Sequence, residues 1–197
     1  MKTQRVLVLV DEANLTCTVR GFDRWVDWKR LRDYLACAEE GRQLLEMAVY
    51  VGMPPTHPDF NEVEDKKDRF VYWLETNGFL VVTREGVPAP ANGNGARGPG
   101  YKANVDVLMA MDAVSLAAEM RPDVVVLVTG DADFAPLARH LRRKGIRVEA
   151  AGIEGSMSRA LRSACNDFID LAELLAEFPG VNGQEAPALG TAGGLFA

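Results

Sequence analysis

The feature that most constrains the fold is an unbroken aliphatic run, VVVLV, from Val124 to Val128. Strands of a parallel sheet that are buried on both faces have such continuous apolar sequences, so this run predicts a central parallel strand. Other short β-branched runs alternate with longer stretches of helical period, which is typical of an α/β fold. We expect strands at 5–10, 44–51, 79–83, 123–129 and 146–150, and helices at 27–39, 61–77, 104–120, 133–144 and 156–178, the last broken near 167–170. The pattern therefore predicts a three-layer α/β/α sandwich with a mainly parallel central sheet.

The length and composition fit one globular domain with a short tail. The chain has 197 residues, of which 48% are hydrophobic and 25% charged, close to the globular average. We expect the domain at 1–178 and a flexible tail at 179–197, where Gly, Ala and Pro leave little to bury. One internal low-complexity stretch, REGVPAPANGNGARGPG at 84–100, predicts a mobile loop beside the functional site.

Charge, cysteine content and motif content exclude several classes of protein. The net charge is -6, so binding to nucleic acid requires a local basic patch or a bound metal. Three cysteines without CxxC spacing and two histidines disfavour a zinc site or a disulfide framework. The chain lacks the GxSxG and GxxxxGK[ST] motifs of serine hydrolases and P-loop NTPases. The first apolar run is too short for a signal peptide and no stretch approaches about 20 apolar residues, so we expect a cytoplasmic location without membrane contact.

Acidic residues follow two of the predicted strands at the point where each strand ends. Asp11 follows the first strand, and Asp131 and Asp133 follow the Val-rich strand. Ligands of open α/β sheets bind beyond the carboxyl ends of the strands, where the strand order reverses. A strand order of 3-2-1-4-5 along the chain would place Asp11 and Asp131 opposite each other. Asp106 begins a helix that crosses to the Val-rich strand, and we expect it near the same edge.

Carboxylates at one place imply a cation. Without one, the like charges repel and raise each other's pKa, and a divalent ion removes this conflict. Mg²⁺ and Mn²⁺ prefer oxygen ligands and need neither histidine nor cysteine. We therefore predict a Mg²⁺ or Mn²⁺ site at Asp11, Asp106, Asp131 and Asp133.

Each of these residues also has a structural interpretation. Asp133 could be the N-cap of the following helix, and Asp106 could be a first-turn acid that interacts favourably with the helix dipole. Asn14 either orients a water or phosphate or caps a turn. For Asp11 and Asp131 we favour a functional role, because each ends a hydrophobic strand where a turn usually has Gly or Asn.

Four segments carry a resemblance to a known family. They are VLVLVDEANL at 6–15, YKANVDVLMAMDAV at 101–114, VVVLVTGDADFAPLARHLRRKGIRVEAAG at 124–152 and SRALRSACNDFIDL at 158–171. Together they resemble the NYN domains of the LabA-like group, within the PIN-like nuclease superfamily. The most specific part is GDxDF followed by a Leu-rich helix and GxxVE. Two positions differ from the family pattern, since Glu12 and Asn104 stand where Gly is common, and Glu12 either adds a ligand or points away.

The resemblance implies a PIN-like, Rossmann-like fold and a metal-dependent ribonuclease. It assigns the catalytic and metal-binding roles to Asp11, Asp106, Asp131 and Asp133, and it places Asn14 as a nearby polar contact. We expect single-stranded RNA as the partner and leave a homodimer open. The alternative is a non-catalytic regulatory module that binds RNA, a nucleotide or a protein, although clustered acids are of little use to an anion-binding module without metal.

The basic residues suggest how RNA would be held. A second group of cations, Arg139, Arg142 and Arg143, is either a further contact to the RNA backbone or a solvated helix end that complements the dipole. The expected RNA or phosphate contacts of the site itself are Asn14, Arg97 and Lys102.

Overall fold

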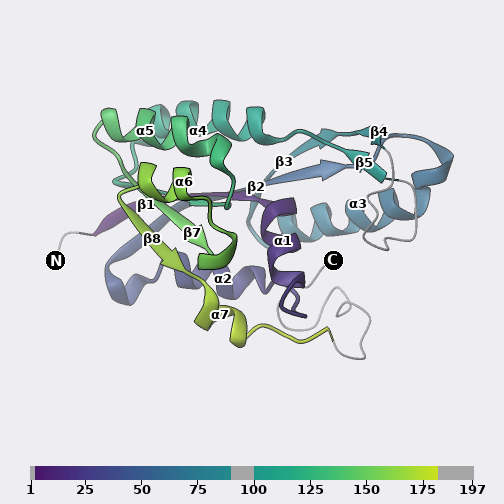
Figure 1. The fold of residues 1–197 in the computed structure, drawn as a ribbon, viewed down its shortest axis with the longest axis horizontal. Helices are drawn as coiled ribbons and strands as arrows, with labels where there is room; N and C mark the ends of the chain where they lie inside the picture. Colours follow the sequence, from purple (N-terminus) through teal and green to yellow (C-terminus); the bar gives the residue numbers. More distant parts are fainter. Residues whose placement is uncertain (1–2, 90–99, 182–197) are drawn as a thin grey trace.

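Six parallel strands form the central sheet of the computed structural model, which describes residues 3–89 and 100–181 (Figure 1). Their order across the sheet is β3-β2-β1-β6-β7-β8. The first five strands thus have the order that the sequence predicts, and the order reverses between β1 and β6, where Val10 pairs with Val128. The strands are β1 (Gln4–Asp11), β2 (Arg42–Met53), β3 (Leu80–Glu85), β6 (Val124–Val128), β7 (Arg147–Gly152) and β8 (Asp167–Asp170).

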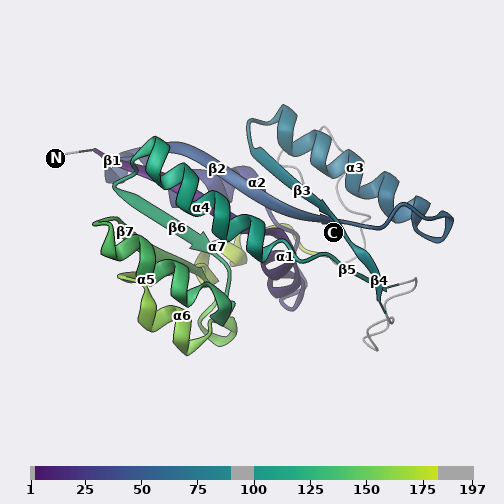
Figure 2. The ribbon, with the colours of Figure 1, turned by 90° about the horizontal axis from the view of Figure 1, so that it is seen from above.

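Helices cover both faces of this sheet, which confirms the predicted α/β/α sandwich (Figures 1 and 2). Strand side chains alternate between the two faces, so Val8 packs into one core and Leu9 into the other. One face carries α1 (Glu12–Arg20), α2 (Trp28–Leu35), α3 (Asn61–Thr76) and α7 (Ala172–Ala176). The other carries α4 (Asp106–Met120), α5 (Ala135–Arg143) and α6 (Arg159–Ala164). Single 3-10 turns are η1 (Ala38–Glu40), η2 (Pro58–Phe60), η3 (Ala132–Phe134) and η4 (Glu154–Ser156).

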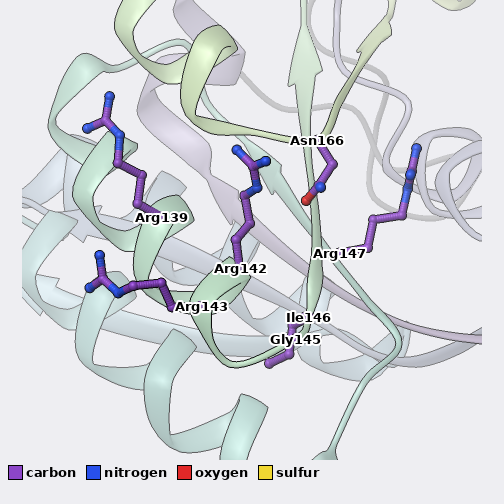
Figure 3. Close-up of a pocket in the computed structure, with 7 residues that line it drawn as sticks. All are labelled: Arg139, Arg142, Arg143, Gly145, Ile146, Arg147 and Asn166. Carbon is purple, nitrogen blue, oxygen red and sulfur yellow. The ribbon is translucent and has the colours of Figure 1, made fainter.

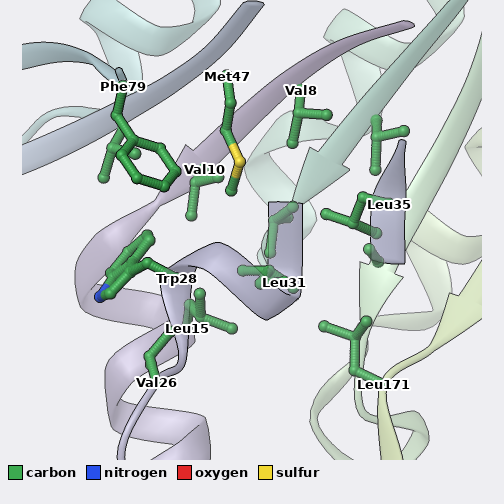
Figure 4. Packing of buried hydrophobic residues seen from close by; sticks show 14 of the residues in the cluster. Val8, Val10, Leu15, Val26, Trp28, Leu31, Leu35, Met47, Phe79 and Leu171 are labelled. Atoms are coloured by element: carbon green, nitrogen blue, oxygen red, sulfur yellow. The ribbon is translucent and has the colours of Figure 1, made fainter. Parts of the chain in front are cut away.

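The core beneath α2 is built around an aromatic cluster (Figure 4). The fully buried Trp28 ring lies 5.6 Å from the Phe70 ring and 6.3 Å from the Phe79 ring, measured between centroids. Leu31 and Leu35 follow Trp28 at the spacing of one helix face and are also fully buried. These contacts pack α2 against α3, in a core that also contains buried side chains of β1, β2 and β6.

Two elements differ from the sequence-based prediction. The helix α1 was not predicted, because Thr16, Thr18 and Val19 are β-branched residues of low helix propensity. The predicted helical region at 156–178 is interrupted at 167–170, as expected, but the interruption is a strand, since β8 pairs with β7 through Phe168 and Ala150. That strand is short and at the edge of the sheet, so it has little of the apolar pattern of the inner strands.

The two ends of the predicted loop at 84–100 are strands that pair with each other. β4 (Val87–Ala89) pairs antiparallel with β5 (Gly100–Lys102), and residues 90–99 lie outside the described part. The predicted tail begins with a contact to the domain, because the carbonyl of Pro179 accepts the Trp25 N–H at 2.9 Å; residues 182–197 are also outside it. Within 3–89 and 100–181, no helix is long and apolar enough to cross a bilayer.

Candidate functional site

Asp11 ends β1 and begins α1. Its Oδ1 accepts the Asn14 N–H at 3.1 Å and its Oδ2 accepts the Thr129 hydroxyl at 3.4 Å. The side chain is buried, with the residue only 6% exposed. Burial, with the added repulsion of Asp106 and Glu12, raises the pKa of Asp11 to about 6, although both hydrogen bonds act in the opposite direction. Asp11 is therefore a carboxylate whose charge is costly in the metal-free protein.

Asp131 and Asp133 lie in the turn that follows β6. The Thr129 hydroxyl accepts the Asp131 N–H at 3.2 Å, and Asp131 Oδ1 accepts the Asp133 N–H at 2.9 Å. Asp131 thus caps η3, and the alternative interpretation of Asp133 as the N-cap of α5 is wrong, because Phe134 occupies that position. Asp133 is exposed. Thr129, which the sequence analysis did not single out, links the ends of β1 and β6.

Asp106 is the first residue of α4 and is half-buried. Burial raises its pKa, and Asp131 and Asp133 raise it further, whereas Lys102 lowers it. Asp106 also raises the pKa of Asp11, so it lies within electrostatic reach of the other three predicted carboxylates. Asp11 ends β1, Asp131 follows β6, and Asp106 interacts electrostatically with both.

The other predicted contacts are placed as follows. Asn14 uses its side-chain oxygen to accept the Gly130 N–H at 2.9 Å, so it ties α1 to the turn after β6. Gly130 has no room for a side chain, because a Cβ atom would lie 2.3 Å from the Ser156 carbonyl oxygen. Lys102 is exposed at the end of β5. Arg97 lies outside the described residues.

Glu12 does not face the other acids as a free ligand. It is 4% exposed, its Oε2 accepts from Lys67 Nζ at 2.7 Å, and its Oε1 accepts from the Thr16 hydroxyl at 3.1 Å. Both carboxylate oxygens are therefore engaged by the protein itself. Lys67 comes from α3, far along the chain, and was not singled out by the sequence analysis.

The donor set fits a hard divalent ion. Asp11, Asp106 and Asp131 offer oxygen atoms only, and their repulsion is the electrostatic conflict that a cation would remove. Among the described residues, no group of three or more His, Cys, Asp or Glu side chains is arranged so that it could hold a metal ion. The fit therefore rests on the chemistry of the donors, since carboxylate oxygens are the ligands that Mg²⁺ prefers.

The raised pKa of Asp11 predicts a pH-dependent gain in stability for Asp11→Asn without metal. Because the folded state holds this proton up to pH about 6 and the unfolded state only to about 3.8, wild-type stability falls as the pH rises through that window. Asparagine removes the loss, and we expect about 2–3 kcal/mol of added stability at pH 7 and none below pH 3.5. Urea unfolding in EDTA across this pH range measures the effect.

The matched control for that experiment is Asp27→Asn. Asp27 caps α2 as Asp11 caps α1, since its Oδ1 accepts the Arg30 N–H at 3.0 Å, but it is not buried. This variant is expected to change stability by less than about 0.5 kcal/mol at any pH. A uniform loss of stability in Asp11→Asn would show that the carboxylate is a structural cap only.

Comparison with known proteins gives relatives of similar length and one partial match. LabA of Synechococcus elongatus, the low amplitude and bright protein, is 25% identical over 175 residues, which cover 88% of this chain and 87% of LabA. An uncharacterized protein of Methanocaldococcus jannaschii, MJ0482, is 37% identical over 70 residues, and the match spans only 29% of its length. The crystal structure of VPA0982 from Vibrio parahaemolyticus, a protein of unknown function, has the same fold, with a TM-score of 0.61, 22% identity and coverage of 86% of this chain and 93% of that one.

The family model of the NYN domain matches residues 5–174. That range runs from the start of β1 into α7 and includes all four carboxylates at the sheet edge. The chain therefore belongs to the NYN domain family, as a LabA-like member.

Proposed function

We propose that this protein is a metal-dependent ribonuclease that cleaves RNA phosphodiester bonds at the acidic edge formed by Asp11, Asp106, Asp131 and Asp133. The observation that carries the proposal is the placement of these acids where β1 and β6 end and the strand order reverses. Burial raises the pKa of Asp11 and of Asp106, and repulsion from neighbouring acids raises both further. NYN family membership supports it, because it relates the chain to the PIN-like nucleases. The clustered negative charges would weaken the binding of an anion in the absence of metal, so they disfavour a protein that only binds anions.

The protein's own groups have distinct roles in this proposal. Asp11, Asp106 and Asp131 would hold Mg²⁺ or Mn²⁺, and the exposed Asp133 would contact it through water. The ion supplies activation of a water and neutralisation of charge on the phosphate and leaving oxygen. Thr129 fixes the Asp11 carboxylate relative to the Asp131 backbone, because its hydroxyl donates to Asp11 and accepts the Asp131 N–H.

The cations around the edge would position the RNA. Lys102 already interacts with Asp106, so it lies where a phosphate oxygen bound at the acidic edge would gain a favourable contact. The Asn14 side-chain oxygen is held by Gly130, which leaves its amide N–H groups as donors for a phosphate or water.

A metal titration tests the proposal. Single-stranded and hairpin RNAs are incubated with the protein in EDTA and then in increasing Mg²⁺ or Mn²⁺, and the products are followed by gel electrophoresis. We expect no cleavage in EDTA, saturable cleavage with either ion and preference for the single strand. RNA binding without cleavage under every metal condition would support the regulatory alternative instead.

A further inference from the structure

A basic cavity lies at the end of the sheet opposite the acidic edge. Its volume is about 640 Å³, and it lies between the C-terminus of α5 and the start of β7 (Figure 3). A neighbouring cavity of about 500 Å³ shares Gly145 and Ile146 with it. We call the two together the arginine groove. Its basic lining residues are Arg121, Arg139, Arg142, Arg143, Lys144 and Arg147, and no described acidic residue lines it.

Only part of this charge is used by the fold. Arg142 donates to the Ala164 carbonyl at 2.7 Å, and Arg147 pairs with Glu149 and Asp167 at 2.7 Å each. Arg139 and Arg143 are exposed and form no hydrogen bond or ion pair with the described residues. These two stand at i and i+4 of one helix, where like charges destabilise it. The helix dipole accounts for cations at the last turn of a helix, but it does not account for Arg139.

The helix α5 connects this groove to the acidic edge. It begins just after Asp131 and Asp133, and Arg143 is its last residue. The nine residues of α5 correspond to about 13 Å. Pro136, Arg139 and Arg143 are all exposed, and their spacing places them on one face of the helix. One elongated ligand could therefore contact both ends of α5.

We propose that the arginine groove binds the sugar-phosphate backbone of RNA, several nucleotides away from the phosphodiester at the acidic edge, with the strand following the exposed face of α5. The cavity and its charge support the binding of RNA in the groove, whereas the path of the RNA along α5 to the acidic edge rests on the proposed function. Arginine is suited to this because its planar guanidinium binds phosphate oxygens in a bidentate manner.

The arrangement of the guanidinium groups favours a polymer over a single phosphate. Figure 3 shows Arg139 and Arg143 on one side of the cavity, Arg142 in the middle beside Asn166, and Arg147 on the other side. These groups are spread along the groove and do not converge on one point. Successive phosphates of a strand would be bound by successive arginines, as in other single-strand binding grooves.

The test is RNA binding by Arg139→Gln/Arg143→Gln in EDTA, where no metal-dependent cleavage occurs. The probe is a fluorescein-labelled single-stranded RNA of about 15 nucleotides, and its anisotropy is measured at several salt concentrations. Loss of two phosphate contacts is expected to weaken binding about tenfold at 0.1 M salt and to reduce the salt slope by about 1.4. Thermal unfolding is measured alongside, and it should not fall because both side chains are exposed.

The control is Lys66→Gln/Arg69→Gln, which removes the same charge from exposed positions on α3. It should retain wild-type affinity and salt slope within about twofold. Equal losses in the two double variants, or wild-type binding by Arg139→Gln/Arg143→Gln, would overturn the groove as an RNA site.

Failure of the groove as an RNA site and failure of the nuclease proposal give different experimental results. If no metal supports cleavage but the groove variant loses RNA affinity, the groove is an RNA site of a non-catalytic protein. If cleavage is metal-dependent while the groove variant binds RNA as the wild type does, the nuclease proposal holds and the groove is refuted.

Discussion

Replacing Asp131 with asparagine is expected to lower metal-dependent RNA cleavage about 10²–10³-fold, because one negative charge is removed from the proposed ion site. The shape of the turn should survive, since an asparagine oxygen can still accept the Asp133 N–H that Asp131 accepts at 2.9 Å. Metal-free stability should hold or rise slightly, because Asp131 repels Asp106 and raises its pKa. Cleavage rates and thermal unfolding with and without Mn²⁺ measure both effects.

Asp170→Asn is the matched control for that variant. Asp170 ends β8 and accepts the Ala172 N–H at 3.0 Å, so it has the same local hydrogen bond as Asp131 outside the proposed site. It should leave cleavage unchanged. If the wild type shows no Mn²⁺-dependent rise in unfolding temperature and Asp131→Asn is merely less stable, the metal site is wrong and the regulatory alternative takes its place.

Replacing Lys67 with methionine is expected to cost about 3 kcal/mol of stability. Lys67 is the cation that pairs with Glu12, whose side chain is only 5% exposed. Its loss leaves a buried carboxylate with one remaining hydrogen bond, from Thr16, and breaking one partner of a buried pair typically costs about 3–5 kcal/mol. Urea unfolding measures the loss, and adding Glu12→Gln should recover most of it, because the uncompensated charge is then gone.

The neighbouring Lys66 provides the comparison. It pairs with Glu62 across one helical turn, and both side chains are exposed. Lys66→Met should therefore cost no more than about 0.5 kcal/mol. Similar costs for the two lysines, or no recovery in the Glu12→Gln double variant, would show that the buried ion pair does not stabilise the fold.

The fold could be predicted because its central strands are buried on both faces. Continuous apolar runs such as Val124–Val128 are typical of parallel strands buried on both faces, and they indicate which segments lie inside the sheet. The elements at the periphery could not be predicted in this way. α1 and β8 are short, mixed in character and stabilised mainly by tertiary contacts, including pairing with β7.

The acidic edge could be located from the sequence, but its supporting contacts could not. The acids follow strand ends, and strand ends of a parallel sheet meet at one edge. The interactions that determine the state of each acid join distant segments, such as Thr129 with Asp11 and Lys67 with Glu12. A side chain's partner across the sheet depends on packing, and no local pattern in the sequence encodes it. Only the folded structure shows that Glu12 is paired with Lys67.

The pairing of β1 with β6 also sets the order in which the protein can assemble during translation. β1 lies between β2 and β6, and Val6 pairs with Val124. At about 5–20 residues per second, the ribosome needs on the order of ten seconds to make the second partner after the first. During this interval one side of β1 has unpaired backbone groups that can pair with another chain. Asp131, which follows β6, is not yet in place beside the end of β1. A nascent chain is consequently without its complete acidic edge, so any cleavage of RNA by this protein would begin only after β6 has left the ribosome.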